Sequence, residues 1–387
     1  MSSKSINDLV KSAKVTVGQL YTLGELERLG LVTLGRGKVI SKIDLANTPG
    51  NNPVYSSSAM GNGEIGRYGK YMFEDERITW SVDGGGRLFY REPHKYSVTN
   101  VCGWLKVNTP GIDTKFLYLL LTSRWGRMTF DYTYKAHPSV IREAYRDLSF
   151  PILSEQHRLT AKIDQITALI KARELQLSKL DQLVKSRFVE MFGDPTARTS
   201  RWKMSPLVEL GELSRGVSKA RPRNSPDLLG GPYPLVQTGE VSNAGLWIES
   251  YNATYSEKGL AQSRMWRKGT LCITIAANIA QTGILTFDAC FPDSVVGFIP
   301  NDRTNAIFIH FWFSFFQSIL ESQAPQVAQK NINLKILSEL RVIEPPVALQ
   351  NAFAAFVVEV DKSEFAVRKS LEELQKLYRQ QLQGAFG

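Results

Sequence analysis

The feature that most constrains this chain is a repeat within its own sequence, because a segment in the middle recurs 194 residues later. The same offset holds over roughly forty residues, which indicates a duplicated structural unit. It superimposes Gln156 on Gln350, Leu159 on Phe353, Ile163 on Val357, Ile166 on Val360, Leu177 on Leu371, Leu180 on Leu374, Leu183 on Leu377 and Phe192 on Phe386. The fold must therefore place two copies of this segment in equivalent settings.

Both copies have the apolar spacing of a coiled-coil helix, with steps of three and four residues. Each follows a proline and ends at a glycine, as helix boundaries commonly do. A whole domain lies between the copies, so the chain leaves along one helix and returns along the other. We therefore predict an antiparallel pair, although each stripe could instead pack only on its own domain. The seam residues are Ile163, Ile166, Ile170, Leu177, Leu180, Val184, Val360, Val367, Leu371, Leu374 and Tyr378, with one interruption at Arg173.

The length of 387 residues is too great for one ordinary core. We divide the chain into a first domain at 1–150, a helix at 151–193, a second domain at 194–345 and a helix at 346–387. Short β-branched and aromatic runs broken by Gly, Asn and Pro predict mostly strands in each domain, with one helix near 115–127 and its counterpart near 307–320. The predicted fold is α+β, with two tandem domains, two long antiparallel coiled-coil helices and a pseudo-twofold internal repeat.

The two domains also correspond to each other, with offsets between 181 and 195 that imply loops of different length. If the repeat is a true pseudo-twofold, Gly387 should lie beside the start of the first domain, just as Gly193 precedes the second. The proposed matches are LGEL at 23–26 with 210–213, PVYSS at 53–57 with PLVQT at 234–238, IT at 78–79 with 273–274, and VCGWL at 101–105 with VVGFI at 295–299.

Composition narrows the class of protein. Hydrophobic residues make up 43% and charged residues 22%, which is typical of a folded globular chain. Lys and Arg outnumber Asp and Glu by 47 to 37, and residues 1–150 hold 20 basic against 14 acidic groups, which favours a polyanionic partner. Cys102, Cys272 and Cys290 are too few and too far apart for a disulfide framework or a zinc site. Without a signal peptide or a long apolar span, we expect a cytoplasmic protein with no membrane contact.

Three patterns are similar to catalytic or cofactor motifs, but each has a simpler explanation. GNGEIG at 61–66 fits GxGxxG, yet no apolar strand precedes it, so we predict a glycine-rich hairpin loop. NPVY at 52–55 is similar to a methyltransferase motif, but it has no glycine motif for the cofactor upstream. The histidines lack metal-ligand spacing and an evident catalytic partner. We therefore predict no catalytic residue, metal site or cofactor in this chain. The four histidines are His94, His137, His157 and His310.

Basic and polar residues gather in loops of both domains, in the combination that nucleic-acid reading needs. Cations bind phosphates, whereas amide, hydroxyl and guanidinium groups read base edges. Each residue alone is as readily a solvated loop residue, so the clusters carry the prediction. The candidates in the first domain are Arg36, Lys38, Lys42, Ser57, Ser58, Asn62, Arg67, Lys70 and Arg87. Those in the second domain are Arg215, Lys219, Arg221, Arg223, Gln237, Thr238, Asn243, Asn278 and Gln281.

Several stretches resemble the specificity subunits of type I restriction-modification systems. They are VKSRFVEMFGDP at 184–195, the two LGEL tetrapeptides, YPLVQ at 233–237 and QKNINL at 329–334. The resemblance covers nearly the whole chain and implies two target recognition domains, each reading one half of a split double-stranded DNA site. It also implies a non-catalytic subunit that binds two methyltransferase subunits, joined by restriction subunits in the full complex. S-adenosylmethionine, ATP and magnesium would then belong to those partners.

A helix of forty residues is about 60 Å long, whereas half-sites one duplex turn apart lie about 34 Å from each other. The predicted helices are thus long enough to space two recognition domains. The stretch before Leu23 is longer than the family pattern, and we expect a capping helix or a partner contact there. Two alternatives remain open, namely a two-domain nucleic-acid-binding or interaction scaffold unrelated to restriction, and an enzyme built around the glycine-rich loop.

Overall fold

The computed structural model describes residues 15–58, 61–130, 135–195, 197, 200–223, 225–276, 279–315 and 332–386. The chain divides into two compact units. The first unit contains the chain up to Arg173 and the segment from Ser370 onward, and the second unit is Glu174–Lys369. Each unit therefore consists of one α+β domain and part of both long helices. A capping helix or a partner contact is predicted in the stretch before Leu23; residues 1–14 of this stretch lie outside the described residues, and residues 15–22 form a turn and a bridge rather than a helix.

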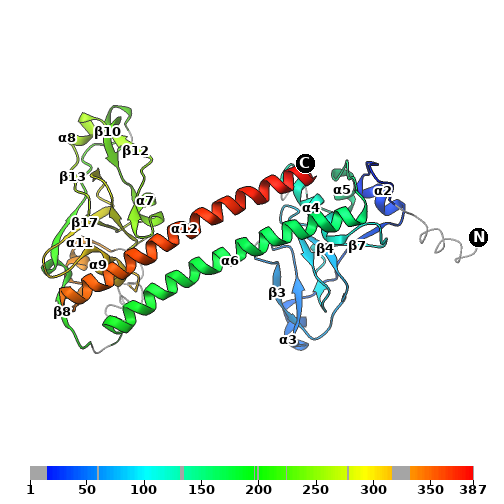
Figure 1. The fold of residues 1–387 in the computed structure, drawn as a ribbon, viewed down its shortest axis with the longest axis horizontal. Coiled ribbons are helices and arrows are strands. Elements are labelled where there is room, and N and C mark those ends of the chain that lie inside the picture. The colour runs from blue at the N-terminus through cyan, green and yellow to red at the C-terminus, as the bar shows by residue number, and fades with distance from the viewer. Residues whose placement is uncertain are drawn as a thin grey trace, which may run out of the picture. The chain divides into compact units, whose positions relative to one another are not determined.

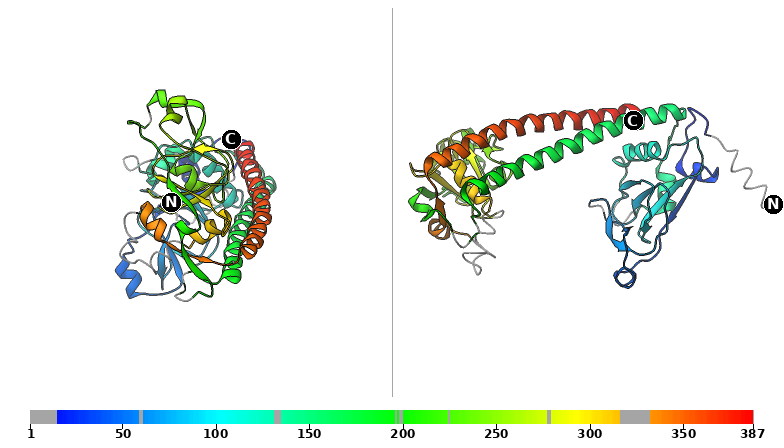
Figure 2. Two further views of the ribbon diagram at one scale, coloured as in Figure 1. Left: turned by 90° about the vertical axis from the view of Figure 1, so that its left-hand side faces the viewer. Right: turned by 60° about the horizontal axis from the view of Figure 1, so that its bottom comes forward.

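The two long helices are α6 (Leu153–Phe192) and α12 (Val347–Phe386), each of 40 residues. In the first unit the start of α6 lies beside the end of α12, and both contribute to one apolar core (Figure 1). In the second unit the end of α6 lies beside the start of α12 (Figure 2). The predicted antiparallel pair is therefore confirmed. Along the seam, Ile163, Ile166, Val184, Val360 and Val367 are buried, whereas Ile170, Leu177, Leu180, Leu371, Leu374 and Tyr378 are partly buried.

The interruption at Arg173 also has a structural explanation. Its Nε donates a hydrogen bond to Ser370 Oγ at 3.3 Å, so the polar position on α6 faces a polar position on α12. A polar side chain in an apolar seam costs little when its donor is satisfied.

The described part of the first unit contains two sheets and four helices besides the long ones. A four-stranded antiparallel sheet has the order β1-β7-β4-β5, and a three-stranded sheet has the order β3-β2-β6. The elements are α2 (Leu23–Arg28), β1 (Val32–Arg36), α3 (Lys42–Asn47), β2 (Asn52–Tyr55), β3 (Glu64–Tyr68), β4 (Arg77–Ser81), β5 (Leu88–Arg91), β6 (Ser97–Val98), β7 (Cys102–Val107), α4 (Thr114–Trp125) and α5 (Pro138–Ala144).

The second unit repeats this plan with larger sheets, in the orders β11-β15-β14-β17-β9, β12-β10-β16-β13 and β18-β8. The helix predicted near 307–320 is α9, and residues 316–320 lie outside the described residues. The elements are β8 (Lys203–Pro206), η1 (Leu207–Glu209), β9 (Gly211–Arg215), η2 (Pro226–Leu228), β10 (Leu229–Leu235), α7 (Thr238–Asn243), β11 (Trp247–Ile248), β12 (Ala253–Tyr255), α8 (Glu257–Ala261), β13 (Met265–Trp266), β14 (Leu271–Thr274), β15 (Thr282–Leu285), β16 (Ala289–Cys290), β17 (Val295–Pro300), α9 (Ala306–Phe313), α11 (Leu334–Glu339) and β18 (Arg341–Glu344).

Strand pairing gives the true correspondence between the domains and corrects part of the sequence alignment. Leu34 pairs with Leu105 as Leu213 pairs with Phe298, so β1 and β7 are equivalent to β9 and β17. By this register, 101–105 corresponds to 294–298 and not to 295–299, so that match is wrong by one residue. Residues 78–79 correspond to 271–272 and not to 273–274, so that match is wrong by two. The LGEL match is also wrong, because 23–26 lies in helix α2 whereas 211–213 lies in strand β9. A tetrapeptide is too short to fix a register that loop lengths shift.

The match between 53–57 and 234–238 is correct. Val54 pairs in parallel with Ser97, and Leu235 pairs in parallel with Cys290, at equivalent places in the two smaller sheets. The central strands β2 and β10 therefore carry the correspondence that the sequence predicts.

A buried glutamine joins the start of each long helix to its domain. The Gln156 amide donates to the carbonyls of Gly111 and Pro151, and its oxygen accepts from the Asp113 amide at 2.9 Å. Gln350 donates to the carbonyls of Arg303 and Pro345, at 3.0 and 2.8 Å. Its oxygen also accepts from the Thr304 hydroxyl at 2.8 Å. Both glutamines are fully buried, and each fixes the loop that begins the domain helix, α4 or α9.

A buried phenylalanine joins the end of each long helix to the same domain helices. Phe192 of α6 packs edge-on against Phe308 of α9, with ring centroids 5.0 Å apart. Phe386 of α12 packs on Phe116 of α4 at 5.1 Å. Phe386 also shares a core with Leu23, near the start of the first domain. This supports the predicted return of the chain, although Gly387 itself lies outside the described residues.

We predict that replacing either buried glutamine with methionine destabilises its own unit by about 2–4 kcal/mol, because three buried polar partners lose their hydrogen bond. Thermal unfolding of Gln156→Met and Gln350→Met should show the affected transition lowered by roughly 5–10 °C. Gln165→Met is the matched control, since Gln165 is exposed on α6. Unfolding of all three variants at the same temperature would refute the role of the buried amides.

Candidate nucleic-acid interface

An arginine followed by glycine ends the first strand of the main sheet in both domains. Arg36 ends β1, and its Nε donates to the Asn100 carbonyl at 2.7 Å. Arg215 ends β9, and its Nε and Nη2 donate to the Asp293 carbonyl at 2.9 and 2.6 Å. Both arginines are exposed, so each guanidinium is oriented by a backbone carbonyl while facing solvent. We name these sites the first corner (Arg36, Gly37, Asn100) and the second corner (Arg215, Gly216, Asp293).

The glycine of each corner is required by a close approach of two backbone segments. A Cβ on Gly37 would lie 1.9 Å from the Val98 carbonyl oxygen, and one on Gly216 would lie 2.3 Å from that of Phe291. The amide of Gly37 donates to the Cys102 carbonyl, and that of Gly216 donates to Val295. This contact holds the strand that carries the arginine against the turn that provides its carbonyl partner.

The loop between β2 and β3 holds the serine and asparagine candidates of the first domain. The predicted glycine-rich hairpin is confirmed, because β2 and β3 are antiparallel neighbours. Ser57 Oγ accepts from the Asp83 amide at 2.9 Å, which connects this loop to the glycine-rich turn at 83–87. Asn62 is exposed, and its side-chain oxygen accepts from the Glu64 amide at 3.0 Å. Ser58 is partly buried beside them.

The other basic candidates of the first domain occupy more than one place. Arg67 of β3 donates to Glu64 and to the Asn51 carbonyl, so its head group is held along the outer strand. Lys42 begins α3, which lies next to β3 (Figure 1), and Lys70 follows β3, so these cations gather at one end of the domain. Lys38, just after the first corner, and Arg87, just before β5, are exposed. The structure thus brings the candidates into neighbouring groups rather than one patch.

Three arginines of the second domain surround one acidic residue. Arg223 Nη2 lies 2.5 Å from Asp293 Oδ1, and Arg221 lies 3.7 Å from the other carboxylate oxygen. Arg215 uses the backbone oxygen of the same residue. The first corner has the neutral Asn100 at the position of Asp293. Asn100 provides no carboxylate to balance the charge of Arg36. Arg–carboxylate pairs of this kind hold a guanidinium in a fixed orientation.

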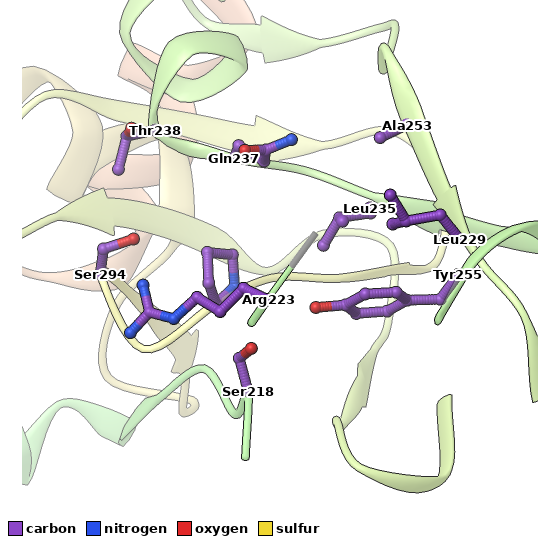
Figure 3. A pocket seen from close by; sticks show the side chains of 10 residues that line it. Ser218, Arg223, Leu229, Leu235, Gln237, Thr238, Ala253, Tyr255 and Ser294 are labelled. Carbon is purple, nitrogen blue, oxygen red and sulfur yellow. The ribbon is translucent and has the colours of Figure 1, made fainter. Parts of the chain in front are cut away.

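A cavity of about 310 Å³ lies beside the second corner. Thr238, Ser294 and Arg223 gather on one side, and Leu229 and Tyr255 on the other (Figure 3). Three predicted residues, Arg223, Gln237 and Thr238, therefore line one cavity together with apolar side chains. Gln237 caps α7 and Thr238 begins it, so both emerge where β10 ends. These three side chains offer the amide, hydroxyl and guanidinium groups that read base edges.

The remaining candidates of the second domain lie elsewhere. Lys219 is exposed after the second corner. Asn243 ends α7 and lines a different cavity of about 320 Å³ that also contains Glu240 and Glu249. Gln281 lines a third cavity, of about 400 Å³, which includes Asp181 and Lys185 of α6. Asn278 lies outside the described residues.

Sequence reasoning missed several residues that shape these sites. The repeated Arg-Gly dipeptide at 36–37 and 215–216 was a readable signal, because an arginine next to a sterically required glycine recurs at the same strand end. The partners Asn100 and Asp293 could not be found, since only strand pairing brings them near. Arg91, a strand residue with a buried guanidinium, gave no sequence signal at all.

Among the described residues, NPVY forms strand β2 and GNGEIG leads into strand β3, so both patterns are part of one hairpin. All three cysteines are buried without a disulfide, and burial raises the pKa of the Cys102 thiol to about 12. No cluster of His, Cys, Asp or Glu there could hold a metal ion. Burial lowers the pKa of His310 to about 4, and its Nδ1 lies 2.9 Å from Thr282 Oγ1. His94 lies 3.1 Å from the Tyr55 hydroxyl. His157 lies 3.6 Å from the Asp113 carboxylate, an acidic neighbour that the sequence did not reveal. None of the described helices is both long and apolar enough to cross a membrane.

Known proteins share both the sequence pattern and the fold. A family model described as the type I restriction modification DNA specificity domain matches residues 21–180 and 199–376. A putative type I specificity subunit of Mycoplasma pneumoniae is 50% identical over 84 residues, which cover 21% of this chain and 44% of that protein. The specificity subunit of the type I restriction enzyme MpnII of the same organism is 38% identical over 125 residues, covering 32% of this chain and 38% of that protein. The chain thus matches less than half of the length of these two relatives.

Solved structures support the same fold over nearly the whole chain. The S subunit of a type I restriction-modification system from M. genitalium covers 95% of this chain and 96% of its own, with a TM-score of 0.60 and 15% sequence identity. Together with two matched domains and the helical pair, these likenesses define a protein with two tandem recognition domains of one fold. The chain belongs to the family of type I restriction-modification DNA specificity subunits.

We predict that alanine at either corner glycine disrupts its strand contact, because the new methyl group would overlap a carbonyl oxygen. Gly37→Ala and Gly216→Ala should each lose about 2–4 kcal/mol of stability, measured by chemical denaturation. Gly126→Ala and Gly239→Ala are controls, since their added Cβ would meet nothing within 4 Å. Equal midpoints for the corner and control variants would contradict this steric requirement.

Proposed function

We propose that this chain gives a type I restriction-modification complex its DNA sequence specificity and is itself non-catalytic. Each recognition domain would read one half of a bipartite target through the major groove. The two corners carry the proposal, because related domains present an oriented, exposed arginine at the same strand end. Arginine is the commonest side chain in specific contacts with guanine and also binds phosphates.

The long helices would space the half-sites and dock two methyltransferase subunits. Their 40-residue length supports a spacing role, since such a helix is about 60 Å long. Apolar side chains that remain exposed on the helices, including Leu169, Leu175, Leu183 and Phe365, fit a partner surface. Restriction subunits would join the full complex. S-adenosylmethionine, ATP and magnesium would be bound by the partner subunits and not by this chain.

Methylome sequencing of a host carrying this subunit and its methyltransferase tests the proposal. We expect methylated adenine in a bipartite, interrupted motif. Replacing residues 205–345 with another recognition domain should change one half of that motif and leave the other intact. A motif that is continuous, or that changes in both halves after the exchange, would contradict the division of labour between the domains.

The alternative is a two-domain scaffold that binds RNA or protein and is unrelated to restriction. Salt-dependent, sequence-specific protection of duplex DNA distinguishes the two, because phosphate contacts release counterions and weaken as salt rises. Preference for single-stranded or A-form RNA, read by stacking and 2′-hydroxyl contacts, would favour the alternative.

We predict that inserting one heptad into both long helices, at superimposed positions, widens the gap between half-sites. Seven residues lengthen a helix by about 10.5 Å, which corresponds to roughly three base pairs at 3.4 Å each. The methylated motif reports the gap directly. A seven-residue insertion after Gly126, at the end of α4, serves as a control that should leave the gap unchanged. An unchanged gap after the paired insertion would refute the spacing role.

A further inference from the structure

Arg91 of β5 is a buried cation surrounded by neutral groups. Only 5% of the residue is exposed. Its Nε donates to Thr79 Oγ1 at 2.9 Å, and its Nη2 donates to the Asn62 carbonyl at 2.8 Å. The guanidinium carbon lies 3.5 Å from the ring centre of Tyr55 and 4.8 Å from that of Phe89. Within the described part of the chain, Arg91 makes no ion pair.

The scaffold does not need this charge, as the second domain shows. Strand register makes Tyr90 equivalent to Ile284, because they pair with Ile78 and Leu271 at matching places. The residue equivalent to Arg91 is therefore Leu285, which is 1% exposed. Tyr55, which faces the guanidinium, corresponds to the buried Val236. The first domain thus fills these two positions with an arginine packed on a tyrosine, and the second domain fills them with a leucine and a valine.

A buried charge without a counter-ion is costly, whereas an apolar pair of similar volume is often neutral or stabilising. Hydrogen bonds to neutral acceptors and the aromatic faces offset part of this cost. Burial also lowers the pKa of Arg91, as desolvation of a cation requires. Because the related domain folds with the apolar pair, the charge of Arg91 points to a function other than stabilising the fold.

The charge lies directly beneath the loop between β2 and β3. Arg91 Nη2 binds the backbone of Asn62, and a Cβ on Gly63 would lie 3.5 Å from that nitrogen. Ser56 closes the loop through its amide, which donates to the Gly63 carbonyl at 3.0 Å. Ser57, Ser58 and Asn62 of this loop are among the residues predicted to contact nucleic acid. A cation at this depth is screened little by salt and water, so its field reaches an anion on the loop.

We propose that Arg91 provides the counter-charge for one DNA backbone phosphate bound on the β2–β3 loop of the first recognition domain. This inference rests on the proposed function and deepens it at one site. Phosphate is favoured over a base edge because the buried guanidinium cannot enter a groove, yet its charge lies directly behind the exposed Asn62, whose carbonyl it binds. Arg91 also positions that loop through the Asn62 carbonyl. The second domain has no such charge at Leu285, so the two half-sites are held differently.

The test compares full-length chains, each in complex with the methyltransferase subunit, for binding to a duplex that carries the target motif. The main variant combines Arg91→Leu with Tyr55→Val, which copies the pair that the second domain already folds with. We expect its slope of log K against log salt to fall by about 0.9, as loss of one phosphate contact requires. Its affinity at 0.1 M salt should fall by roughly tenfold or more. Arg91→Lys, which keeps the charge, should retain the slope.

Leu285→Met in the second domain is the matched control and should leave the slope and affinity unchanged. Circular dichroism and thermal unfolding check that each variant folds. Loss of affinity with an unchanged salt slope, or unchanged affinity, in the folded double variant would overturn the phosphate site alone. If the wild-type complex shows no salt-dependent, sequence-specific duplex binding, the proposed function fails and this inference fails with it.

Discussion

Each domain of this chain is held at the same place by the beginning of one long helix and the end of the other. The buried amides of Gln156 and Gln350 fix the loops that begin α4 and α9. The rings of Phe386 and Phe192 pack on those same two helices. The buried hydrogen bonds and the aromatic contact at each domain helix leave little freedom where the long helices meet the domain. Within each unit, these contacts connect the domain helix to both long helices.

The repeat made the main architecture predictable from sequence, because its period and its apolar spacing are independent signals that agree. Gln156 and Gln350 appeared in the alignment as a superimposed pair, although nothing in the sequence showed that they would be buried. The alignment of the domains themselves was only partly right. The match at 53–57 was correct since strands β2 and β10 carry it, whereas LGEL recurs in a helix and in a strand. Loops of different length shift the register, and only strand pairing restores it.

The candidate interface was less predictable for a physical reason. Loop residues such as Arg36 and Arg215 could be chosen by type, but their partners come from turns more than 60 residues away. Asn100 and Asp293 occupy one position in the fold and differ by a charge. Arg91 and Leu285 likewise occupy one buried position in the fold and differ by a charge. The two domains thus keep one scaffold and differ in electrostatics, as the proposed reading of two unlike half-sites would require.

The anchoring of Phe386 has a consequence for how the protein is made. Ser123 of α4 donates to the Phe386 carbonyl across 263 positions of sequence. During synthesis on the ribosome, the first domain emerges long before Phe386 is made. The apolar surface around Phe116 therefore lacks this ring until then. The second domain obtains Phe192 from the helix made just before it. The part translated first is therefore the part whose core is completed last.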